Sequence, residues 1–191
     1  MPDRSATMET ALPRHRFTVA DYHRMVEAGI LTENDRVELI RGEIVVMAPI
    51  GSPHSACVCR LNEAFEPLGA TTLRSSQNPV VLMDSEPEPD FLLLARRDDY
   101  YAGAHPTPAD VYLLVEVADS SQRFDRGVKG PLYASNGIRE YWIVDLETDR
   151  VEVHRSPEER RWREVSIPGR GDSVALEAFP EFVVPLDDVL P

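Results

Sequence analysis

The stretch VYLLVEV (residues 111–117) has the length and apolar composition of a buried strand, and one acid, Glu116, interrupts it. Earlier in the chain, PDFLLL (89–94) places a second acid, Asp90, directly before another apolar strand. A buried carboxylate without a partner is costly, so such acids normally lie beside a cation or a hydrogen-bond donor. Two of them at the ends of neighbouring strands predict an oxygen-rich site for Mg²⁺. The alternative is a solvent-facing Asp90 and a Glu116 paired with an arginine.

The sequence around these two strands predicts an α+β protein with a curved mixed β-sheet flanked by helices. TVAD (18–21) resembles a capping box and predicts a helix with Tyr22, Met25 and Val26 inward. A hairpin is expected over 36–47, with its turn at Arg41-Gly42. Further helices are predicted over 54–69 and 123–136, and further strands over 79–83, 91–94, 140–144, 151–154 and 162–167.

Length and composition predict one domain and a cytoplasmic location. The 191 residues fit a single domain over 17–191 after a flexible tail over 1–16. No apolar run approaches the roughly 20 residues that span a bilayer, and the first residues lack a signal-peptide core, so no membrane partner is expected. The net charge of −13 opposes non-specific binding to nucleic acid. A nuclease would therefore need its acids gathered at metals or on a distant surface, leaving a local basic face.

The basic residues include nineteen arginines and a single lysine, Lys129. Chance retention of one lysine is the simple explanation, but an ammonium also has a pKa that shifts readily on burial, which arginine cannot offer. Asp125, Lys129 and Tyr133 are spaced by four and share one face of the predicted helix. A lysine beside metal-bound carboxylates can orient or deprotonate an attacking water molecule, or stabilise charge on a phosphate.

An ordered set of motifs resembles the Uma2 family, assigned to the PD-(D/E)XK restriction-endonuclease-like superfamily. The motifs are VELIRGEIVVM (37–47), SPH (52–54), PVVLMDSEPEPD (79–90), LLVEVADSS (113–121), the D-x-x-x-K-x-x-x-Y spacing and GIREYWIVD (137–145). The resemblance covers roughly 17–153 and implies a restriction-endonuclease-like fold. It also implies a metal-dependent endonuclease that hydrolyses DNA, with Mg²⁺ or Mn²⁺ as cofactor. Such folds commonly pair, so a homodimer is expected, with the apolar stretch 179–190 as interface or core.

The resemblance also assigns residues. Asp90 is the expected first metal ligand, Glu116 the second, and Lys129 the catalytic lysine, supplied by the following helix because Ala118 occupies the usual lysine position. Glu38 is a further expected metal ligand. Three residues are expected near a phosphate or behind the ligands: His54, Asp125 and Tyr133. Structural roles are favoured for Tyr133 and for Glu140.

One departure from the family pattern concerns the helix that carries Lys129. Gly130-Pro131 follows the lysine directly, and a proline clashes with the carbonyl four residues back, here Gly127. The sequence therefore predicts a kink, a break or a new helix start at Pro131, any of which changes the direction of Lys129.

Two other functions fit the same residues. The acidity and Gly130-Pro131 favour a binding or regulatory module on the same fold without turnover. A metal-dependent hydrolase of small phosphoesters would be hindered less by the net charge than an enzyme acting on duplex DNA.

Overall fold

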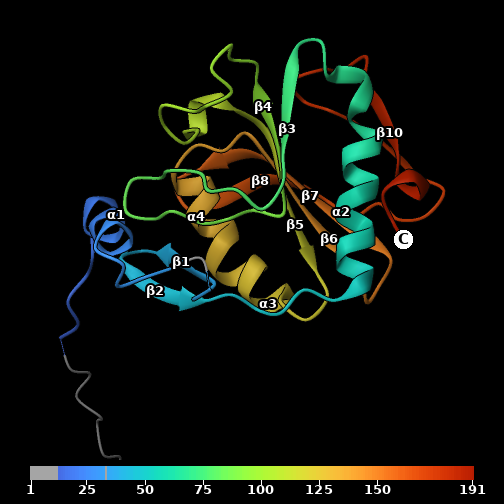
Figure 1. Ribbon diagram of the computed structural model, residues 1–191. Coiled ribbons are helices and arrows are strands. Elements are labelled where there is room, and N and C mark those ends of the chain that lie inside the picture. The colour runs from blue at the N-terminus through green and yellow to red at the C-terminus, as the bar shows by residue number, and fades with distance from the viewer. Residues whose placement is uncertain (1–12, 33) are drawn as a thin grey trace, which may run out of the picture.

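The computed structural model describes residues 13–32 and 34–191, and its centre is a mixed β-sheet of six strands in the order β3-β4-β5-β6-β7-β8 (Figure 1). Strands β5 and β6 are parallel, and the other neighbours are antiparallel. The strands are β1 (Val37–Ile40), β2 (Glu43–Val46), β3 (Thr72–Ser75), β4 (Phe91–Ala95), β5 (Val111–Ala118), β6 (Glu140–Asp145), β7 (Arg150–Glu158), β8 (Arg161–Ser166), β9 (Ser173–Ala175) and β10 (Val183–Pro185). The helical segments are α1 (Val19–Glu27), α2 (Ser52–Ala64), η1 (Glu66–Leu68), η2 (Pro108–Asp110), α3 (Gln122–Phe124), η3 (Asp125–Lys129), α4 (Gly130–Ser135) and η4 (Leu186–Asp188).

Both faces of the sheet are covered, because successive apolar residues of its central strands point to opposite faces. Phe91 and Leu93 belong to the core under α2 and the C-terminal strands, whereas Leu92 and Leu94 belong to the core under α4 and the β1–β2 hairpin. Figure 1 shows these two layers on opposite sides of the sheet. The predicted α+β class and the mixed sheet flanked by helices are confirmed.

The parallel pair β5–β6 requires a crossover, and the helix that carries Lys129 provides it. Helical structure is continuous from Gln122 to Ser135, without a break at Gly130-Pro131. A new α-helical segment, α4, begins at Gly130 with Pro131 in its first turn, as one of the predicted alternatives had it. Before it, η3 is a π-helical turn, in which the Gly130 N–H bonds to the Asp125 carbonyl five residues back. The extra residue of a π turn shifts the carbonyl positions relative to Pro131, which lets the helix continue. A Cβ atom at position 130 would lie 3.2 Å from the Asp125 oxygen, so glycine leaves room for this turn.

The N-terminal elements follow their predicted local signals. Thr18 and Asp21 form the capping box of α1. Arg41 and Gly42 have φ of 50° and 73°, which suits the tight turn between β1 and β2. The inward placement of Val26 is wrong, because this side chain is half exposed at the edge of a cavity.

The strand predicted over 79–83 is wrong, and β3 was not predicted. Val80 and Leu82 are buried, but their N–H groups bond to Pro87 and Ser85 within the same loop. Because these backbone groups bond within the loop, the described segment 79–83 does not pair with a strand of the sheet. The missed strand β3 pairs antiparallel with β4 at the edge of the sheet, and its polar residues carry little strand signal.

Both ends of the described chain contact the rest of the protein. Residues 1–12 of the expected tail lie outside the described residues, and Arg16 donates a hydrogen bond to the Arg41 carbonyl at 2.6 Å. In the C-terminal stretch 179–190, Val184, Leu186 and Leu190 belong to the core of this chain. The homodimer stays a prediction. Within the described residues, no helix has both the length and the apolar character that crossing a membrane requires.

Candidate active site

Asp90 and Glu116 lie opposite each other on adjacent strands. Phe91 pairs with Val115 in the β4–β5 ladder, so the next pair in this register sets Asp90 against Glu116. Leu92 and Leu114, each two residues away from one of these acids, belong to the core under α4, so both acids point to that face. The Val117 N–H donates to Asp90 Oδ2 at 2.8 Å, which fixes the aspartate beside the end of β5.

Lys129 joins these acids from the crossover helix. Its Nζ lies 3.0 Å from Glu116 Oε1 and 3.2 Å from Glu38 Oε2, and all three side chains are at most 7% exposed. Tyr133, one turn further along the helix, donates to the same Glu116 oxygen at 2.6 Å. The structure thus brings together one acid from β1, one from β5 and the single lysine.

His54 and Asp125 complete the predicted set. His54 Nε2 lies 2.9 Å from Asp90 Oδ1, and its buried Nδ1 has no hydrogen-bond partner among the described residues. Asp125 Oδ2 accepts a hydrogen bond from the Ser121 hydroxyl at 2.5 Å. Each of the two therefore lies at the site, His54 beside an expected ligand and Asp125 on the helix of Lys129.

A cavity of about 250 Å³ opens onto these residues. All of the predicted site residues except Tyr133 line it, and Tyr133 lies behind Glu116. Among the residues that sequence reasoning did not place at the site, Arg36, Gln77, Glu88 and Asp119 also line the cavity.

The segment EPEPD (86–90) contained a signal for Glu88. In an extended chain, alternate residues point to the same side. Glu86, Glu88 and Asp90 therefore share one side, and the two intervening prolines point to the other. Asp90 lines the cavity of the site, Glu88 lines this cavity and a second one, and Glu86 lines only the second. The three carboxylates form a row that leads away from the site.

The site is electrostatically crowded with carboxylates. Burial raises the pKa of Glu116 well above its ordinary value, and Asp90, Asp125 and Glu38 raise it further, while Lys129 opposes them. Burial also raises the pKa of Glu88. For Lys129, burial favours the neutral amine, but Glu116 and Glu38 outweigh it and raise the pKa of the ammonium. The lysine is therefore a cation that only partly offsets the surrounding negative charge.

The donor set fits a hard divalent cation in chemistry and in charge. In residues 13–32 and 34–191, no three histidine, cysteine, aspartate or glutamate side chains form a ready-made metal centre. Mg²⁺, however, is commonly held by one or two carboxylates, with water and substrate phosphate as its other ligands. Asp90 and Glu116 provide such a pair, and a bound cation would reduce the repulsion between the carboxylates of this pocket.

The order of the strands and the flanking helices define a restriction-endonuclease-like fold. A solved structure of a putative nuclease belonging to DUF820 from Anabaena variabilis shares it, with a TM-score of 0.68 and 16% identity, over 91% of this chain and 97% of that one. The chain belongs to the Uma2 family, described as putative restriction endonuclease, which it matches over residues 19–187. No curated protein sequence matches the chain.

Proposed function

We propose that this protein is a Mg²⁺- or Mn²⁺-dependent endonuclease that hydrolyses DNA phosphodiester bonds at Asp90 and Glu116. The observation that carries the proposal is the placement of Lys129, whose ammonium lies 3.0 Å from the carboxylate that stands opposite Asp90. The family description and the nuclease named for the structural relative support the same class of reaction.

In this proposal Asp90 and Glu116 hold the ion, and Glu38 supports it from β1. A bound divalent ion would lower the pKa of a water molecule and offset charge on the phosphate. Asp90 is already oriented by the Val117 N–H and by His54. Glu116 is oriented by the Tyr133 hydroxyl, which would continue to hold this carboxylate if Lys129 turned toward the substrate.

Lys129 acts in the proposal as a positive hydrogen-bond donor to the scissile phosphate. Its Nζ already donates to two carboxylates, which hold the group as an ammonium. A phosphate oxygen entering the cavity would compete with these acids for the same donor. This arrangement favours stabilisation of developing negative charge over removal of a proton from water.

Calorimetry and a cleavage assay test the proposal. Mg²⁺ or Mn²⁺ is titrated into the wild type, Asp90→Ala and the control Glu63→Ala, which removes an exposed carboxylate of α2. We expect binding to the wild type and the control and much weaker binding to Asp90→Ala. Equal binding to all three proteins would refute the metal assignment. Cleavage of plasmid and single-stranded DNA should require the metal and disappear in Lys129→Ala.

A binding module without turnover is the second candidate, because Lys129 already pairs with Glu38 and Glu116, two of the expected metal ligands. Cleavage by the wild type and Glu63→Ala, but not by Lys129→Ala, would exclude it. A hydrolase of small phosphoesters is the third, favoured by the modest cavity of about 250 Å³. Turnover of a generic phosphodiester that DNA does not inhibit would support this candidate.

A further inference from the structure

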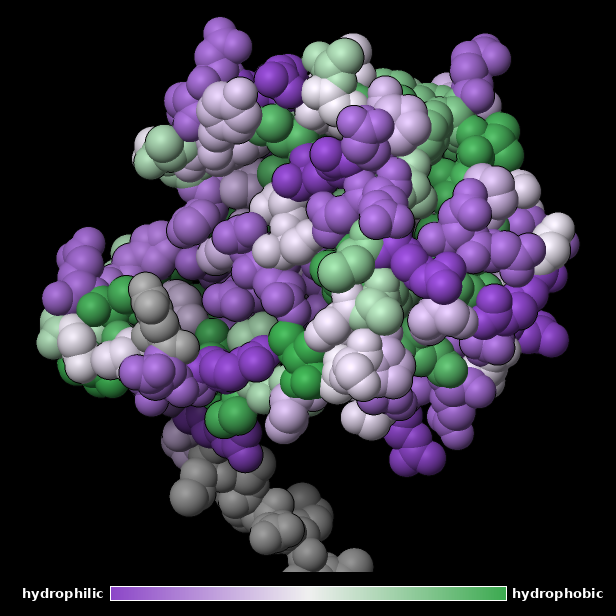
Figure 2. Space-filling model, turned by 45° about the vertical axis from the view of Figure 1, so that its right-hand side comes forward, coloured by the Kyte–Doolittle hydropathy of each residue, from purple (hydrophilic) through white to green (hydrophobic). Residues whose placement is uncertain are grey.

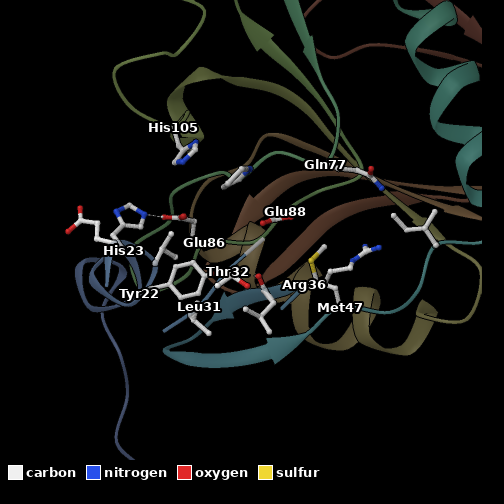
Figure 3. Close-up of a pocket in the computed structure, with 15 residues that line it drawn as sticks. Tyr22, His23, Leu31, Thr32, Arg36, Met47, Gln77, Glu86, Glu88 and His105 are labelled. Atoms are coloured by element: carbon white, nitrogen blue, oxygen red, sulfur yellow. Dashed lines mark hydrogen bonds and ion pairs between the residues drawn. The ribbon is translucent and has the colours of Figure 1, made fainter. Parts of the chain in front are cut away.

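A second, larger cavity of about 630 Å³ adjoins the site (Figure 3). It is bounded by α1, the loop that follows α1, the start of β1, the segment 77–88 and His105. Arg36, Met47, Ile50, Gln77 and Glu88 line both cavities, which makes the two spaces contiguous. Figure 2 shows a hollow with hydrophilic sides between the lobe that contains α1 and the rest of the molecule. A chain whose phosphate lies at Asp90 and Glu116 would therefore pass this cavity.

The walls of this second cavity combine apolar surface with a few polar groups. The apolar side chains are Tyr22, Val26, Leu31, Val37, Met47, Ile50 and Pro79. The Tyr22 hydroxyl is fixed by a hydrogen bond to the Val37 carbonyl at 2.9 Å, so its ring presents a defined surface. Thr32 and Gln77 offer both donors and acceptors at the same walls. Such a lining fits a flat ligand with polar edges.

The charges in the cavity lining are mixed in sign, and this restricts the class of ligand. Glu86 Oε2 lies 2.6 Å from His23 Nε2, and Glu27, Glu88 and Arg36 line the same cavity. A phosphate would meet three carboxylates, and a strongly cationic ligand would meet Arg36. A neutral group with donors and acceptors on its edge avoids both conflicts, and a nucleobase has this chemistry.

We propose that the second cavity binds an unpaired nucleobase of the DNA strand whose phosphate occupies the site, so that the enzyme acts on single-stranded or locally opened DNA. The inference rests on the proposed nuclease function and adds the substrate class. The base stacks on the apolar wall beside Tyr22, and the carboxylates of Glu86 and Glu88 accept hydrogen bonds from amino groups on its edge. Enzymes that act on extruded nucleotides use this combination of stacking and edge contacts. The acidic row that contacts the base also keeps phosphate groups out of the cavity.

The test measures binding separately from cleavage. A labelled strand of abasic residues receives one adenine at each position in turn, and binding is measured by fluorescence anisotropy with Ca²⁺ in place of Mg²⁺. We expect one position at which adenine tightens binding by about 5-fold or more, the effect of stacking one base. A 2-aminopurine at that position should change its fluorescence on binding, and pairing it in a duplex should remove the gain.

Two tryptophan variants locate the effect. Val26→Trp places an indole at the cavity wall, and Val165→Trp on β8 is the matched control, because the two valines are 50% and 52% exposed. The adenine preference should be unchanged in Val165→Trp and altered in Val26→Trp, because an indole at the wall either fills the space of the base or adds a stacking surface; circular dichroism checks that both variants are folded. Equal affinity of the wild type for adenine and abasic strands would overturn the inference, and so would a preference that Val26→Trp leaves unchanged.

The outcomes also separate this inference from the nuclease proposal. Lys129-dependent cleavage without any adenine preference would support the nuclease proposal and refute the base site. An adenine preference sensitive to Val26→Trp, without cleavage, would leave the base site on a protein that lacks nuclease activity. A third outcome is that free adenosine binds with the sensitivity to Val26→Trp that is expected of the strand, while the strand itself does not bind. In that case the ligand is a nucleoside and the assignment to DNA is wrong.

Discussion

Replacing Lys129 with methionine tests the geometry on which the site depends. The substitution keeps an unbranched side chain as far as the ε carbon and removes the ammonium that lies 3.0 Å and 3.2 Å from Glu116 and Glu38. Both acids are about 5% exposed or less, so the variant leaves two carboxylates buried without their cation. Removing one partner of a buried ion pair typically costs ~3–5 kcal/mol. We therefore expect Lys129→Met to lower the free energy of unfolding by at least about 3 kcal/mol.

Urea denaturation without metal measures this loss. Glu116→Gln in the same chain removes one uncompensated charge and keeps an oxygen for Tyr133, so the double variant should recover at least about 1 kcal/mol. The loss should also shrink at mildly acidic pH. Burial raises the pKa of Glu116, and Lys129 opposes this rise, so the folded variant holds its proton more tightly than the unfolded chain and loses stability as pH increases. A loss below about 1 kcal/mol, typical of an exposed pair, would refute the buried arrangement.

Three further variants test what supports the site. Gly130→Ala should change the free energy of unfolding by less than about 1 kcal/mol, since alanine favours helix. It should nevertheless slow DNA cleavage, because its Cβ crowds the Asp125 carbonyl. Unchanged cleavage would show that the π turn is dispensable. Trp162→Phe removes the indole hydrogen bond to the Gly130 carbonyl at 3.2 Å and should cost about 1 kcal/mol in urea denaturation, with no loss contradicting this bond. Glu140→Gln weakens a fully buried acceptor of Arg155, Trp142 and the Glu177 N–H, and should cost about 3 kcal/mol. Calorimetry should show unaltered Mg²⁺ binding by Glu140→Gln, and altered binding would place Glu140 in the site.

The parts of the fold that depend on local rules could be predicted from the sequence. The capping box at Thr18, the Arg41-Gly42 turn and the strand around Glu116 each follow from a few adjacent residues. The pairing of Asp90 with Glu116 could also be anticipated, since an acid in each of two apolar strands needs a shared partner.

The parts that depend on distant contacts could not be predicted. The edge strand Thr72–Ser75 is defined by pairing with β4, not by its own composition. The π turn that keeps Lys129 in place depends on the room at Gly130 and on Trp162 from β8, more than thirty residues away. The cavity beside the site combines α1, the segment 77–88 and His105, which no sequence spacing connects.

The distribution of charge bears on how a chain with a net charge of −13 would bind DNA, as we propose. Six carboxylates line the cavity of the site, from Glu38, Glu88, Asp90, Glu116, Asp119 and Asp125, against the two cations Arg36 and Lys129. The described lining of this cavity therefore has a formal net charge of −4, out of −13 for the chain, where a divalent cation would be held. Without a metal ion the cavity repels phosphate, and with one the repulsion falls, so metal and DNA should bind cooperatively.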